Sequence, residues 1–144
     1  MQIELAGPVH DSTYFEREVR PLLGEGVSYL GHLPQAALAT VLGGASATVV
    51  TPIWDEPYGL VVAESLACGT PVAAFARGGI PEILNRASGV LVPDGDVPAL
   101  AAALPRVTHL SRQSALDRAR SFCDIEDMVD AYLDLFRASV GVAA

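Results

Sequence analysis

The chain has 144 residues, of which 51% are hydrophobic, enough for one compact domain that buries about two thirds of the surface its unfolded chain would expose. A net charge of −8, from nine basic and seventeen acidic residues, excludes a nucleic-acid partner held by phosphate neutralisation. All nine basic residues are arginines, so a mechanism that needs a lysine on a phosphate cannot be completed by this chain.

Short apolar runs alternate with helical patterns along the first two thirds of the chain. This alternation is typical of repeated βα units, which form a parallel sheet with helices on both faces. The predicted strands are Ile3–Ala6, Val27–Leu30, Ala47–Thr51, Val72–Phe75 and Val90–Val92. The predicted helices between them are about Thr13–Leu23, Gln35–Leu42, Leu60–Cys68 and Pro81–Asn85. Five such strands can form one small sheet.

After the last strand the pattern is helical only, so a helical extension is predicted from about residue 97. Asp96, Ser111 and Asp124 are suitable N-caps for three helices, because their side-chain oxygens can accept from free N–H groups of a first turn; the first helix should end near Leu104. In the third helix Met128, Tyr132, Leu135 and Phe136 recur at three- and four-residue steps. This stripe is interpreted as a surface that packs against the sheet or against a neighbouring domain.

Signals for targeting, anchoring and cross-linking are missing from the sequence. No apolar run approaches the ~20 residues of a membrane span, and the N-terminus lacks the pattern of a signal peptide. Cys68 and Cys123 lie within apolar helical patterns and are interpreted as small buried hydrophobic residues rather than a disulfide or metal ligands. A soluble, cytoplasmic protein is expected.

The segment from Thr51 to Phe75, TPIWDEPYGLVVAESLACGTPVAAF, contains the candidate chemistry. It comprises a strand end, a loop, a helix and the next strand. Ligands of open parallel sheets bind beyond the carboxyl ends of the strands, and a helix that begins after Gly59 presents free N–H groups and a partial positive charge there. The loop is therefore a candidate phosphate site, and a glycine at this position allows close approach of the backbone.

Glu56 and Glu64 lie on either side of this helix start. Five residues at ~1.5 Å each place Glu64 about 7 Å along the helix from Gly59, so the two carboxylates can bracket a bound anion. A nucleoside diphosphate sugar has a vicinal diol on each side of its diphosphate, and a carboxylate can accept from both hydroxyls of a diol. The alternatives are that Glu56 only complements the helix dipole and that Glu64 is an ordinary solvent-facing residue. The otherwise apolar helix favours a functional Glu64.

The run EPYGLVVAESLACGTPVAA resembles the signature of family 4 retaining glycosyltransferases, which have two Rossmann-like domains in the GT-B fold. Four further segments agree with that family: IELAGP (3–8), VSYLGHLP (27–34), GGIPEIL (78–84) and SGVLVPDGD (88–96). The resemblance covers nearly the whole chain and thins after about Leu104. It implies that residues 1–144 are a single, partial C-terminal domain that binds the nucleotide sugar, in an α/β, Rossmann-like fold with helices on both faces of a parallel sheet.

The resemblance also assigns roles to residues. Glu56 would bind hydroxyls of the donor sugar and Glu64 the ribose. Backbone amides would hold the sugar and the phosphates, and the base would lie against the end of an earlier strand. The residues implied in binding the donor are Tyr58, Gly59, Leu60, Val61, Ser28, Tyr29, Leu30 and Gly7. Tyr58 replaces the family's commoner phenylalanine.

Two departures from the family bear on activity. The arginine and lysine that grip the diphosphate would lie upstream of Met1, and so would the N-terminal domain that supplies the acceptor site. The chain is therefore expected to bind donor and to lack turnover alone, and the N-terminal domain would carry the acceptor and any peripheral membrane contact. No metal or cofactor is expected. A binding-only or truncated module and a nucleotide-sugar epimerase-like protein are the alternatives.

Other polar residues give weaker signals. His10, His32 and His109 are scattered, without partners at metal-ligand spacing. Arg77 could reach a phosphate from the edge of the sheet or could be a solvated loop residue. Glu82 is explained as well by the dipole of a short helix as by a ligand.

Overall fold

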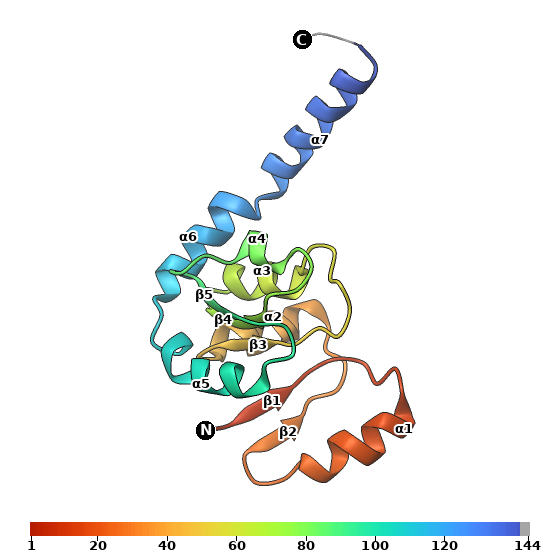
Figure 1. Cartoon of the computed structure of the whole chain (residues 1–144), viewed down its shortest axis with the longest axis vertical. Helices are drawn as coiled ribbons and strands as arrows, with labels where there is room; N and C mark the ends of the chain where they lie inside the picture. Colours follow the sequence, from red (N-terminus) through yellow and green to blue (C-terminus); the bar gives the residue numbers. More distant parts are fainter. Residues whose placement is uncertain (142–144) are drawn as a thin grey trace. The chain divides into compact units, whose positions relative to one another are not determined.

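The computed structural model describes residues 1–141. The chain divides into two compact units, Met1–Val41 and Leu42–Ala144. Each unit contains its own parallel sheet (Figure 1). The five predicted strands are all present, but they form one sheet of two strands and one of three. The first strand pairs with the second, and the third strand pairs with the fourth.

The first unit contains β1 (Ile3–Leu5) and β2 (Val27–Tyr29), paired in register from Ile3 opposite Val27 to Leu5 opposite Tyr29. The predicted helix over 13–23 is a helical segment with changing hydrogen-bond spacing: α1 (Ser12–Tyr14), a π-helical turn η1 (Phe15–Val19) and a 3₁₀ turn η2 (Arg20–Leu22). Pro21 has no N–H to donate, so a regular α-helix cannot continue through it.

The helix α2 (Gln35–Gly44) spans the boundary between the units. The second unit contains three parallel strands in the order β3 (Thr48–Val50), β4 (Val72–Phe75) and β5 (Gly89–Val92). Its helices are α3 (Leu60–Ala67), α4 (Ile80–Ile83), α5 (Val97–Val107), α6 (Arg112–Phe122) and α7 (Ile125–Ser139).

The central strand β4 separates two hydrophobic clusters. Successive side chains of a strand point to opposite faces: Val72 and Ala74 belong to a cluster with residues of α3, α4 and α6, whereas Ala73 and Phe75 belong to a cluster with residues of α5. All four residues of β4 are buried. Helices therefore cover both faces of this sheet, as predicted.

The predicted caps of the last three helices are confirmed. Asp96 accepts from the Ala99 N–H at 2.9 Å, Ser111 from Ser114 at 3.2 Å and Asp124 from Glu126 at 2.8 Å. The helix α5 continues past the predicted end at Leu104, through Pro105, to Val107, which is completely buried and holds the last turn against the sheet.

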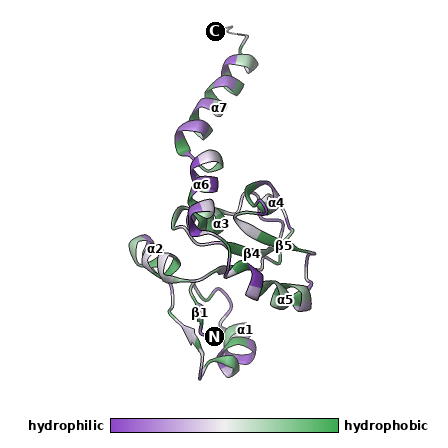
Figure 2. Cartoon of the chain, turned by 90° about the vertical axis from the view of Figure 1, so that its left-hand side faces the viewer, coloured by the Kyte–Doolittle hydropathy of each residue, from purple (hydrophilic) through white to green (hydrophobic). Residues whose placement is uncertain are grey.

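The helix α7 does not pack its apolar stripe against the sheet. None of its residues is buried, and Tyr132 and Phe136 are 55% and 60% exposed. Figure 2 shows hydrophobic and hydrophilic residues along this helix. Of the two partners proposed for the stripe, the sheet is therefore excluded.

The prediction that both cysteines are buried is wrong. Cys68 and Cys123 are free thiols and half-buried, because each is the C-cap of a helix, α3 and α6 respectively, where the chain turns toward the surface. Within residues 1–141, no helix has the length and apolar character required to cross a membrane.

Candidate donor site

Three loops meet at the carboxyl edge of the three-stranded sheet. The parallel strands β3, β4 and β5 end at Val50, Phe75 and Val92. Parallel strands present their carboxyl ends at the same edge, so the following segments 51–59, 76–79 and 93–96 share it. The segment 51–59 leads directly into α3 and holds Glu56.

The first turn of α3 is open to a ligand. Gly59 precedes it with φ 99° and ψ 54°, in the left-handed region, and provides no side-chain cap. The first N–H groups bonded within the helix are those of Val62 and Ala63, which both donate to the Gly59 carbonyl. The amides of Leu60 and Val61 precede them, and a helix start of this kind favours an anion.

Gly59 is required here for two reasons. Its positive φ disfavours other residues, and a Cβ at this position would lie 3.1 Å from Cγ1 of Ile80 in α4. The helix start is thus packed closely against α4. The sequence predicted a glycine here for a different reason, the close approach of the backbone to a ligand.

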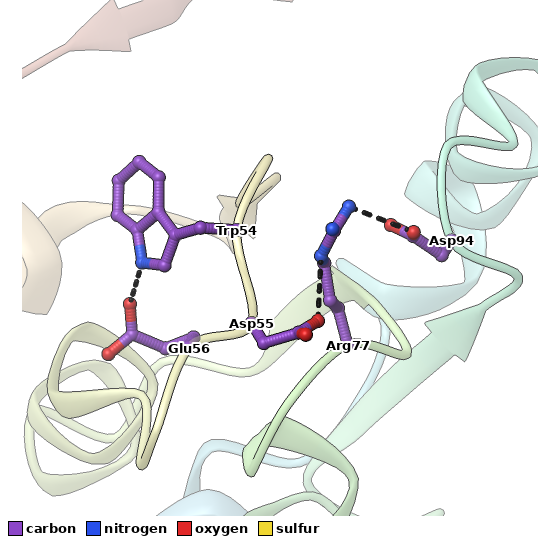
Figure 3. A network of polar contacts seen from close by, with 5 residues as sticks. All are labelled: Trp54, Asp55, Glu56, Arg77 and Asp94. Atoms are coloured by element: carbon purple, nitrogen blue, oxygen red, sulfur yellow. Dashed lines mark hydrogen bonds and ion pairs between the residues drawn. The ribbon is translucent and has the colours of Figure 1, made fainter.

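The two glutamates are both half-buried but differ in their contacts. Oε2 of Glu56 accepts a hydrogen bond from Nε1 of Trp54 at 3.0 Å (Figure 3). Glu64 lies in the second turn of α3, and no hydrogen bond or ion pair holds its carboxylate within residues 1–141. Neither carboxylate is neutralised by a cation of the described chain, so both can accept from a ligand.

The Tyr58 side chain is directed to the end of α6. Burial raises the pKa of its phenol, and hydrogen bonding to Cys123 raises that pKa further. The backbone amide of Tyr58 lies directly before Gly59 and the start of α3.

The other residues predicted to bind the donor nucleotide sugar belong to the first unit. The Tyr29 hydroxyl donates to the Gly7 carbonyl at 2.6 Å, and the Tyr29 ring lies 4.8 Å from that of Phe15. The Leu30 amide donates to Leu5 at 2.8 Å, while Ser28 is exposed. The structure thus brings Gly7 and Tyr29 together at the end of β1 and β2. The other predicted residues, from Glu56 to Glu64, lie before α3 and in its first two turns.

The sequence did not identify Trp54 as part of the site, and it left the role of Arg77 open. Trp54 orients Glu56, and Arg77 forms ion pairs with Asp55 at 3.2 Å and with Asp94 at 3.0 Å. Arg77 is therefore not the solvated loop residue considered from the sequence. Nothing in the sequence pairs residues 22 and 17 positions apart, and only their positions after neighbouring strands could have suggested it.

Metal binding would require several ligand side chains close together. Among the residues that the structure describes, no three His, Cys, Asp or Glu side chains gather in a way that could hold a metal ion.

Comparison with known proteins identifies the family. Residues 5–121 match the family model of glycosyl transferases group 1. The D-inositol 3-phosphate glycosyltransferase of Mycobacterium marinum is 34% identical over 128 residues, which cover 83% of this chain and 27% of that protein. This chain thus spans about a quarter of the length of that relative.

Solved structures agree in fold. Sucrose-phosphate synthase of Thermosynechococcus elongatus matches with a TM-score of 0.81 and 29% identity, over 99% of this chain and 39% of that one. HepE of Anabaena, solved in complex with UDP-glucose, matches with a TM-score of 0.77 over 95% of this chain and 41% of its own, and at 19% identity it shares the fold alone. The fold is that of a GT-B glycosyltransferase domain. The chain belongs to the group 1 glycosyltransferase family.

Proposed function

We propose that this chain binds the nucleoside diphosphate sugar in a retaining glycosyl transfer, and that the acceptor is bound by a second domain. The observation that supports this most directly is the uncapped first turn of α3, with Glu56 before it and Glu64 within it. The diphosphate would accept hydrogen bonds from the amides of Tyr58 to Val61. Glu56 would accept from hydroxyls of the sugar, and Glu64 from those of the ribose.

The division between the two glutamates is the one that the family resemblance implies, and their positions in the chain support it. Glu64 lies one turn inside the helix, whereas Glu56 lies in the loop, three residues before Gly59. An anion at the helix start would then have one carboxylate before it and one beyond it along the chain, which suits a ligand with a diol on both sides of its diphosphate. Charge-assisted hydrogen bonds of this kind contribute about 1.5–3 kcal/mol each.

The proposed chemistry is electrostatic rather than covalent. When the bond between the sugar and the diphosphate breaks, negative charge grows on the leaving oxygens, and amides already directed at that position stabilise it. The acceptor hydroxyl would attack on the face from which the diphosphate leaves, which retains the configuration of the sugar, and its proton would pass to the departing phosphate oxygen. The chain has no lysine, so further cations would come from outside it.

Two other functions remain to be compared with this one. A binding-only module would use the same helix start without transfer. A nucleotide-sugar epimerase would share the fold and return an altered sugar. Incubation of the chain, joined to its acceptor-binding domain, with a nucleotide sugar and an acceptor, followed by product analysis, distinguishes transfer, epimerisation and simple binding.

The test of the proposed site replaces each glutamate with glutamine and measures the Kd for UDP and for UDP-glucose by NMR titration. Glu64→Gln should weaken both ligands similarly, by about 1–2 kcal/mol, because it would bind the ribose that they share. Glu56→Gln should weaken UDP-glucose and leave UDP nearly unchanged. Glu126→Gln, an exposed change of the same kind on α7, is the control.

Two results would contradict the proposal. If Glu56→Gln weakens UDP and UDP-glucose equally, Glu56 does not recognise the sugar. If titration of the unchanged chain changes no chemical shifts from Gly59 to Glu64 and changes those of other residues only, the ligand binds elsewhere.

A further inference from the structure

Arg77 connects the three loops at the carboxyl edge of the sheet. Its Nε lies 3.2 Å from Oδ1 of Asp55, and its Nη1 lies 3.0 Å from Oδ2 of Asp94 (Figure 3). The Arg77 side chain is 29% exposed, compared with 86% for Asp55. The arginine is thus the fixed member of the pair, and Asp55 is the residue that it restrains.

The backbone next to Arg77 holds the same loop. The Gly79 amide donates to the Glu56 carbonyl at 2.8 Å. A Cβ on Gly78 would lie 2.1 Å from the Glu56 carbonyl oxygen, and one on Gly79 would lie 2.4 Å from that of Pro57. Atoms cannot approach so closely, so both glycines are needed for the two loops to touch. The segment 77–79 therefore restrains both the Asp55 side chain and the Glu56 backbone.

The charges around Arg77 argue against a direct role on the ligand. Its single positive charge faces two carboxylates, so the group of three is negative overall and does not attract a diphosphate. A guanidinium that donates one hydrogen bond to each of two carboxylates is instead suited to fixing geometry.

We infer that Arg77 is a positioning residue, which holds the Asp55–Glu56 loop in the conformation that receives the donor sugar. This inference rests on the proposed function for the role of Glu56. It differs from the role considered from the sequence, in which Arg77 reaches a phosphate.

The test uses the full chain with Arg77→Gln, Asp55→Asn and both changes together, and Arg86→Gln as the control. Arg86 is exposed in the loop before β5 and loses the same charge. The first readout is hydrogen exchange of the Gly79 amide without ligand. Exchange should rise about threefold to fivefold in either single variant, as expected for the loss of an exposed ion pair, and no further in the double variant. Arg86→Gln should leave it unchanged.

The second readout separates positioning from a purely structural role. Arg77→Gln and Asp55→Asn should each weaken UDP-glucose about threefold to fivefold, while the Kd for UDP stays nearly constant. If Arg77 contacted the diphosphate, Arg77→Gln would weaken UDP, and Asp55→Asn would strengthen it by freeing the guanidinium. That opposite effect of Asp55→Asn would overturn the inference.

The two proposals can fail separately. If the unchanged chain binds no nucleotide sugar, the proposed function fails, and the exchange of Gly79 still decides whether Arg77 holds the loop. If ligands bind at α3 but exchange is the same in all variants, the inference about Arg77 is wrong and the site stands.

Discussion

The two ends of α3 differ in how their backbone groups are satisfied. At the C-terminal end, the Thr70 amide donates to the Ser65 carbonyl and the Ser65 hydroxyl donates to the Thr70 carbonyl, both at 2.9 Å. The Thr70 hydroxyl donates to Leu42 at 2.6 Å. At the N-terminal end, Gly59 provides no cap, and Leu60 and Val61 are 67% and 45% exposed.

A single arginine accounts for much of the order at the C-terminal end. Nη2 of Arg112 donates to the carbonyls of Cys68 and Gly43 at 3.2 and 2.6 Å, and Nη1 donates to Ala45 at 2.8 Å. These carbonyls belong to the ends of α3 and α2, where the helix dipoles favour a cation. The same helix thus has one end closed by protein groups, which supports stability, and one end left to a ligand.

The largest effect predicted from this comparison is on stability. Replacing Arg112 with Met should lower the free energy of unfolding by about 2–3 kcal/mol, because the carbonyls lose charge-assisted hydrogen bonds and the helix ends lose a cation. Denaturant unfolding followed by circular dichroism measures the change. Arg120→Met changes an exposed arginine of α6, the helix that also contains Arg112, and should change stability little. Equal losses in the two variants would show that the C-terminal end is not held by Arg112.

A smaller effect is predicted at the N-terminal end. Gly59→Ala should cost about 2 kcal/mol, from the left-handed backbone and from the Cβ that would lie 3.1 Å from Ile80. Gly95→Ala is the control for the first cause, because Gly95 also has a positive φ, 72°, but no atom within 4 Å of its Cβ. Gly95→Ala should lower the free energy of unfolding by about 1 kcal/mol.

The two glycine variants should also differ in ligand binding. Gly59→Ala displaces the helix start and should weaken UDP, whereas Gly95→Ala should not. If both variants lose equal stability and neither affects UDP, the close packing of Gly59 against α4 has no part in the site.

The comparison also shows which features the sequence could predict. The loop, the start of α3 and the positions of Glu56 and Glu64 follow from local pattern: a buried strand, a glycine and an apolar helix. The roles of Arg112 and Arg77 could not be predicted, since their partners are backbone groups and aspartates far away in sequence.

The features that the sequence left open have the same origin. The sequence predicted strands by composition, and it could not determine that β1 and β3 would each pair with only one neighbour, because pairing depends on contacts between segments. Likewise, the period of α7 indicated an apolar stripe, but period alone does not determine which surface covers it. The donor residues around β2 remain predictions.

The smallest predicted effect concerns Tyr58, at the open end of α3. Its pKa is raised by burial and by Cys123, so folding favours the neutral phenol. The stability that this provides is fully present below the unfolded pKa, near 10, and is lost as the pH rises through the higher folded value. Tyr58→Phe cannot ionise and should therefore lose less stability than the unchanged chain above about pH 10. Below that pH the difference between the two should be constant.

Absorbance at 295 nm during alkaline titration measures the phenol directly, and denaturant unfolding at several pH values measures the linkage. Tyr14→Phe, at an exposed tyrosine in the first unit, is the matched control. Tyr58→Phe should remove the tyrosine that ionises late, and Cys123→Ala should move the titration of Tyr58 to lower pH, because the contributions of Cys123 to the raised pKa are gone. If Tyr58 titrates like Tyr14, its side chain is free of α6. The open end of α3 would then be held only by Gly59 and the loops around Arg77.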